Sequence, residues 1–124
     1  MADRHTTTDL LLTLAEGTRL RILNCLSAAP LFVSDLQAIL GLPQPTVSRH
    51  LRVLREIGAV RDTPIAQFVL YRLDRPGGPR GRLFALVLDA VAMDEQMRAE
   101  RHQATRRSRE HFRVRTESLA GALP

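Results

Sequence analysis

The chain has 124 residues, enough for one domain with a single hydrophobic core and too few for two independent ones. Hydrophobic residues make up 44% of it but aromatic residues only 4%, so the core must come mostly from aliphatic side chains, a mixture that favours helices. The net charge is +5 and the chain contains no lysine, so arginine carries all of the basic charge, which is compatible with a polyanionic partner.

Several classes of protein are disfavoured at this point. The single cysteine, Cys25, cannot form an internal disulfide, so nothing indicates an oxidising compartment. No apolar run approaches the roughly 20 residues that cross a bilayer, and charges interrupt the N-terminal stretch where a signal peptide needs an apolar segment. No glycine-rich phosphate loop, nucleophile elbow or carboxylate pair is present. We therefore expect a cytoplasmic protein without membrane contact, catalysis or a cofactor.

The first half of the chain predicts four helices. Leucines at helical spacing after a threonine-rich cap predict a helix over 6–15 that Gly17 closes, and a second follows over 18–27. Ser34 with Gln37 fits a capping box at the start of a third helix. The turn "GLPQP" is so short that the third helix must meet the fourth, Pro45–Ile57, at a steep angle.

After Gly58 the apolar period changes from about 3.6 to 2. This predicts strands over 59–62 and 68–73, joined by "TPIAQ" as a hairpin tip. Residues 74–81 are rich in proline and glycine and form a loop, and one long helix follows over 82–101. The wide apolar face of that helix comprises Leu83, Leu86, Val87, Ala90 and Val91.

These elements predict a fold class. We expect a mainly α protein with a small β-hairpin (α+β), a winged helix-turn-helix in the order α-α-α-α-β-β-α. Residues 1–101 would form the domain, and residues 102–124 a basic polar extension that is partly helical or frayed. The apolar face over 83–91 exceeds what one small core covers, so we expect a homodimer built by the first and last helices.

The fourth helix has two different sides. Its buried stripe is predicted to contain Val47, Leu51 and Leu54, which follow the i, i+4, i+7 spacing. A second stripe carries Pro45, Ser48, Arg49 and Arg52. Arginine can bond two guanine acceptors, Gln44 can read adenine, and Pro45 or Thr46 can meet a thymine methyl. The alternative is that these side chains are merely solvated.

Three segments resemble a known family. The segments "LAEGTRLRILNCL", "VSDLQAILGLPQPTVSRHLRVLREIGAVRD" and "FVLYRL" are similar to the ArsR/SmtB family of bacterial winged-helix repressors. The resemblance covers roughly residues 8 to 73. It implies a dimeric repressor that binds a pseudo-palindromic DNA operator and releases it when an inducer, often a metal ion, binds. By position, the family's recognition contacts fall on Gln44, Pro45, Thr46, Ser48 and Arg49, with His50 and Arg52 beside them.

The chain departs from the family pattern at three places. Phe32 and Ser34 occupy the positions of a cysteine pair, so the thiolates that arsenite or soft metals need are absent. At the family's other metal site only Asp89 and His102 remain, while Val91 and Thr105 replace the other two ligands. The wing tip, with Ile65, Ala66 and Gln67, lacks the usual basic and glycine-rich composition. We therefore expect no metal site of the standard kind, and the inducer stays unidentified.

Alternatives remain open. Cys25 is either a small core residue or a thiol-reactive sensor, and the chain could be a metal or redox sensor with a non-standard site that includes Asp89 and His102. It could instead be a protein-interaction module of the same fold with vestigial DNA binding. The basic run over 106–115 is either a solvated helix end or an extra phosphate-binding arm.

Overall fold

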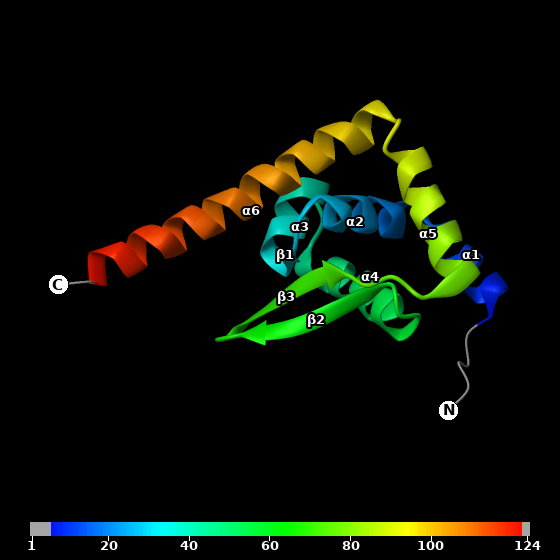
Figure 1. Ribbon diagram of the computed structural model, residues 1–124, viewed down its shortest axis with the longest axis horizontal. Coiled ribbons are helices and arrows are strands. Elements are labelled where there is room, and N and C mark those ends of the chain that lie inside the picture. The colour runs from blue at the N-terminus through cyan, green and yellow to red at the C-terminus, as the bar shows by residue number, and fades with distance from the viewer. Residues whose placement is uncertain (1–5, 123–124) are drawn as a thin grey trace.

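The computed structural model describes residues 6–122 and confirms a mainly helical fold with a small β-hairpin (Figure 1). Two details of the expected order are wrong, because a short extra strand precedes the third helix and the last helix is divided in two. The elements in chain order are α1 Thr7–Leu14, α2 Gly17–Ala28, β1 Leu31–Phe32, α3 Val33–Leu40, α4 Gln44–Glu56, β2 Val60–Ile65, β3 Phe68–Leu73, α5 Gly78–Val91 and α6 Glu95–Ala122.

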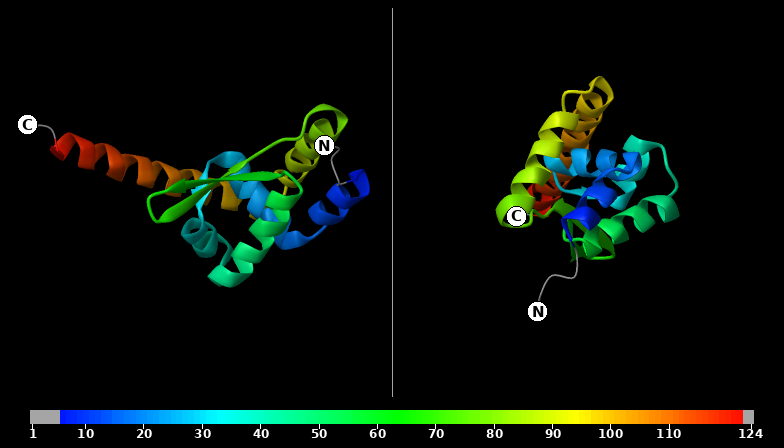
Figure 2. Two further views of the ribbon diagram at one scale, coloured as in Figure 1. Left: turned by 90° about the horizontal axis from the view of Figure 1, so that it is seen from below. Right: turned by 90° about the vertical axis from the view of Figure 1, so that its right-hand side faces the viewer.

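Three antiparallel strands form the sheet, in the order β1-β3-β2. Strand β1 was not predicted, because it has only two residues and exists through its pairing of Leu31 with Tyr71 and of Phe32 with Leu70. Strands β2 and β3 form the hairpin of the wing, which extends away from the helical body (Figures 1 and 2). The wing is therefore anchored to the start of α3 through β1.

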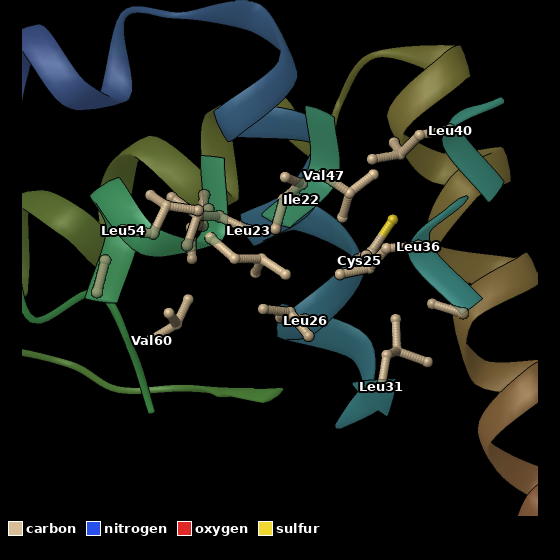
Figure 3. Packing of buried hydrophobic residues seen from close by; sticks show 14 of the residues in the cluster. Ile22, Leu23, Cys25, Leu26, Leu31, Leu36, Leu40, Val47, Leu54 and Val60 are labelled. Carbon is tan, nitrogen blue, oxygen red and sulfur yellow. The ribbon is translucent and has the colours of Figure 1, made fainter. Parts of the chain in front are cut away.

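The core lies between α2, α3 and α4 (Figure 3). Leucine, isoleucine and valine dominate it, as the composition predicts, and its fully buried aliphatic members include Ile22, Leu23, Leu31, Leu36, Val47, Leu51 and Leu54. Complete burial of such a side chain stabilises the fold by about 1.5–3 kcal/mol. The packing fixes α4 against the body through one side only.

Several helix boundaries follow from their caps. The threonine cap of α1 is confirmed, since Thr6 Oγ1 accepts from Asp9 N–H at 3.1 Å. Gly17 does not close α1 as predicted but begins α2, because the Glu16 carboxylate caps the next helix by accepting from Arg19 N–H at 2.8 Å. The turn after α3 is confirmed, with Gly41 at a positive φ of 69°.

The predicted capping box of Ser34 with Gln37 is wrong. Helix α3 begins one residue earlier, at Val33, and the side chain that reaches back is Asp35, which accepts from Phe32 N–H at 2.9 Å. A carboxylate in the first turn of a helix satisfies a free N–H and suits the positive end of the helix dipole. Pairing of Phe32 in β1 determines this start, and the local sequence alone did not reveal it.

The single long helix predicted over 82–101 is also wrong. Helix α5 ends at Val91, where Met93 and Asp94 N–H groups bond back three residues to Ala90 and Val91. The Asp94 carbonyl then accepts the first bond of α6, from Arg98 N–H at 2.9 Å, and aspartate is favoured at such a start. The chain turns sharply here, so that α6 passes over α2 and α3 (Figure 1).

Helix α6 continues to Ala122, so the domain boundary predicted at residue 101 lies inside a helix. Residues 1–5 and 123–124 of the predicted domain and extension lie outside the described residues. Over residues 6–122, none of the helices combines the length and apolar character needed to cross a bilayer.

Candidate nucleic-acid interface

The predicted two-sided character of α4 is confirmed. Val47, Leu51 and Leu54 are fully buried, with a relative exposure of 0% each. They lie about one turn apart and belong to the core cluster with residues of α2 and α3, in which Figure 3 labels Val47 and Leu54. Pro45 occupies the first turn, where a missing N–H costs nothing. The buried side therefore holds α4 rigidly and leaves its other side to solvent.

The second stripe of α4 is accessible. Gln44, Pro45, Arg49 and Arg52 are exposed, while Thr46 and Ser48 are partly so. Among the side chains that the structure describes, none forms a hydrogen bond or ion pair with the guanidinium groups of Arg49 and Arg52. Gln44 Nε2 donates to Ser48 Oγ at 2.7 Å. The edge thus presents two unpaired cations and a pre-oriented amide and hydroxyl, a set that suits base edges and phosphates.

His50 differs from its predicted neighbours in this group. Its side chain is 22% exposed, and Nδ1 lies 3.7 Å from Glu16 Oε2 at the start of α2. Partial burial would raise the pKa of Glu16, but N–H groups of Arg19 and Thr18, with His50 nearby, hold that pKa below its usual value. His50 therefore has a contact within the protein that Arg49 and Arg52 lack.

The wing tip is tighter than predicted. Thr63, Pro64 and Ile65 belong to β2, so the loop expected over "TPIAQ" is reduced to Ala66 and Gln67. Ala66 adopts a positive φ of 54°, as a two-residue hairpin turn requires. Ile65 and Phe68 pair across the end of the hairpin and are exposed at 37% and 56%. The predicted wing residues Ile65, Ala66 and Gln67 are therefore accessible, but the tip carries no charged side chain.

The candidate sensor residues differ in accessibility. Cys25 is fully buried in the core, and this burial, with Glu100 nearby, raises the pKa of its thiol to about 12, which keeps it in the unreactive protonated form. Asp89 on α5 and His102 on α6 are both exposed. The part of the chain that the structure describes contains no group of three or more His, Cys, Asp or Glu side chains that could hold a metal ion.

Several polar contacts of α6 were not predicted from the sequence. Arg21 of α2 bonds Glu100 through Nη2 and Oε2 at 2.6 Å and through Nε and Oε1 at 3.1 Å. Asp35 of α3 accepts from Arg107 and contacts His111. The partners are more than 70 residues apart in the sequence, so only the tertiary fold reveals them. The sequence contains one indication of such a contact, which is the acidic residue Asp35 among mostly apolar neighbours.

Comparison with known proteins places this geometry in a family. Residues 16–62, which contain α2, α3 and α4, match the family model described as bacterial regulatory protein, arsR family. The fold is similar to the crystal structure of the transcriptional repressor BigR from Xylella fastidiosa, with a TM-score of 0.56 and 30% identity, covering 69% of this chain and 79% of that one. The chain belongs to the arsR family of bacterial regulatory proteins.

Two further proteins are similar to part of this chain. The HTH-type transcriptional regulator Rv2034 of Mycobacterium tuberculosis is 41% identical over 64 residues, which are 52% of this chain and 60% of that protein. The HTH-type transcriptional repressor SmtB of the same species is 38% identical over 84 residues, 68% of this chain and 58% of that protein. The chain thus spans about three fifths of these two relatives' length, and α6 lies beyond the residues that the family model matches.

Proposed function

We propose that this arsR-family chain is a DNA-binding transcriptional regulator, a repressor in the cytoplasm, and that it is not an enzyme. The observation that supports this most is the free edge of α4, where Arg49 and Arg52 lie opposite the buried stripe and have no partner among the described side chains. A helix held this way can enter a major groove with its N-terminal half. The relatives SmtB and BigR are named as transcriptional repressors.

In this proposal the residues of α4 have separate roles. Arg49 and Ser48 read base edges, with Gln44, Pro45 and Thr46 at the groove floor, while Arg52 contacts the phosphate backbone. His50 supports the position of α4 through Glu16 and lies at the margin of the contact. The wing tip, Ile65 to Gln67, lacks a cation for the minor groove, so it contributes little to affinity.

We propose a homodimer as the DNA-binding form. Large apolar side chains remain exposed on α1, on α5 and just beyond it, with Leu12 at 66%, Leu86 at 66% and Met93 at 74%. The first turns of α1 and α5 meet, since Arg80 Nε donates to Thr7 Oγ1 at 3.2 Å. A second copy covering this face would remove apolar surface from water and repeat α4 about 34 Å away, which suits a pseudo-palindromic operator.

The proposal is tested by measuring binding to the DNA upstream of the chain's own gene and to random DNA, each at two salt concentrations. Specific binding with a strong salt dependence is expected. Arg49→Ala should weaken specific binding by about 1–3 kcal/mol and relax the sequence preference at one position. Arg98→Ala removes an exposed arginine of α6 and is the matched control. It should change neither the affinity for the specific DNA nor the sequence preference. If Arg49→Ala lowers the affinity for the upstream DNA and for random DNA equally, Arg49 does not read bases. If the wild-type chain shows no salt-dependent binding to DNA at all, it is a protein-interaction module instead.

A further inference from the structure

The second half of α6 lies against the helix-turn-helix unit. Helix α6 first packs along α2 and then along α3 and β1. Its far end and the wing tip point to the same side of the molecule (Figures 1 and 2). Helix α6 is too polar overall to be held there by the hydrophobic effect alone. Specific polar contacts therefore decide how it is held.

A buried carboxylate provides such a contact. Asp35 is fully buried, and its Oδ1 accepts from Arg107 Nε at 2.8 Å and lies 2.7 Å from His111 Nε2. Its Oδ2 accepts from Phe32 N–H at 2.9 Å. Burial alone would raise the pKa of Asp35, but the hydrogen bonds from His111, Arg107 and Phe32 outweigh burial and hold that pKa below its usual value. Asp35 is therefore charged, and both side chains that satisfy its Oδ1 come from α6.

The same cluster continues into the wing. The Phe32 ring packs edge-on against His111, with ring centroids 5.4 Å apart, and against Phe68, with centroids 6.0 Å apart. Phe32 also belongs to β1, which pairs with β3 of the wing. His111 therefore contacts the capping carboxylate of α3 and, through Phe32, the aromatic residue at the wing tip.

Other arginines of α6 occupy the opposite side. Arg106 and Arg109 are exposed, and neither makes a hydrogen bond or ion pair within the described part of the chain. At 100° per residue they lie on the far side of the helix from Glu100 and Ala104, which are buried. They face away from α3, so they do not contribute to the Asp35 cluster.

We propose that the second half of α6 is a strap that sets the position of the wing and of α3 for DNA binding, with Arg107 and His111 as its positioning residues and Asp35 as its anchor. This inference rests on the proposed function and adds a positioning contact to it. Loss of the strap leaves a buried carboxylate without two of its three partners, so the start of α3 and β1 must rearrange to hydrate it. Because β1 pairs with β3, that rearrangement reaches the wing.

The test compares two double variants of the full chain. Arg107→Ala with His111→Ala removes the strap contact, and Arg106→Ala with Arg109→Ala removes two arginines from the opposite side of the same helix. Amide hydrogen exchange at Phe32, Leu70 and Tyr71 should accelerate on the order of tenfold in the first variant and stay unchanged in the second. Affinity for the upstream DNA should fall on the order of tenfold in the first variant only.

A conservative variant separates positioning from general destabilisation. The single variant His111→Gln retains a donor for Asp35 and keeps Arg107. Its amide hydrogen exchange at Phe32 should stay slow, and its affinity for the upstream DNA should be nearly that of the wild type. Unchanged exchange in β1 and β3 for the folded Arg107→Ala, His111→Ala variant would overturn the strap. Greater loss of affinity in the Arg106→Ala, Arg109→Ala variant would also overturn it and would make α6 a phosphate-binding arm. If the wild-type chain binds no DNA, the proposed function fails, while the exchange measurement still decides whether the strap exists.

Discussion

Helices α4 and α6 both carry many arginines, but only α6 uses arginines to attach itself to α2 and α3. On α4 the leucine and valine stripe makes the contact with the body, and Arg49 and Arg52 have no partner among the described residues. On α6 polar side chains make much of the contact, since Glu100 bonds Arg21, Arg101 Nε donates to Asn24 Oδ1 at 2.8 Å, and Arg107 bonds Asp35. The number of arginines on a helix therefore does not identify a binding surface, because some of them hold the helix in place.

The largest expected effect concerns the buried side of α4. Leu51→Ala should lower the free energy of unfolding by about 2–5 kcal/mol, because it removes a fully buried side chain and leaves a cavity in a core that relaxes only partly. Val53→Ala, at a position 36% exposed on the same helix, is the matched control and should cost less than about 1 kcal/mol. Urea titration measures both, and comparable losses would mean that α4 is not held by one side.

The next effect concerns the polar attachment of α6. Glu100→Ala should lower the free energy of unfolding by about 1–3 kcal/mol, because Arg21 and its neighbours lose a buried carboxylate partner. Partial exposure of Arg21, at 25%, limits the loss because water can hydrate the guanidinium. Glu95→Ala, an exposed residue at the start of α6, should change stability by a few tenths of a kcal/mol. If Glu100→Ala behaves like Glu95→Ala in urea titration, α6 is not held by this pair.

The smallest expected effect is a pH dependence. The pKa of Asp35 is lower in the folded protein than its ordinary value, so its contribution to stability is present above that ordinary value and is lost as pH falls through the lower folded value. The wild-type chain should therefore lose part of its stability on acidification from about pH 4. The Asp35→Asn variant should not show this acid-induced loss of stability when its thermal unfolding is followed from pH 6 to pH 3. Parallel curves for both proteins would assign the acid sensitivity to other carboxylates.

The sequence predicts the helix-turn-helix well, because local rules determine it. Apolar spacing located α4 and its buried stripe, and the short "GLPQP" turn with Gly41 fixed the junction with α3. The free arginine edge follows directly from that spacing. The accessible residues of the candidate site on α4 could therefore be predicted from the sequence. The exception is His50, whose side chain lies near Glu16.

Features that depend on distant partners could not be predicted. Strand β1 exists only because Leu31 meets Tyr71, and the start of α3 depends on Asp35, which α6 partners satisfy. The break near Asp94 was hidden because the residues on both sides favour helix. The polar cluster of α6 joins residues more than 70 positions apart, a separation that no local pattern reports.

The claim that α4 presents the DNA-binding edge is tested most directly by site-specific crosslinking. Cys25 is buried and its thiol pKa is raised to about 12, so a thiol-specific photocrosslinker should label an introduced cysteine selectively. Arg52→Cys places the label beside the free edge of α4, and His102→Cys places it on the exposed side of α6. We predict efficient crosslinks to the upstream DNA from position 52 and almost none from position 102. Crosslinks from position 102 without any from position 52 would contradict the assignment of the binding surface to α4.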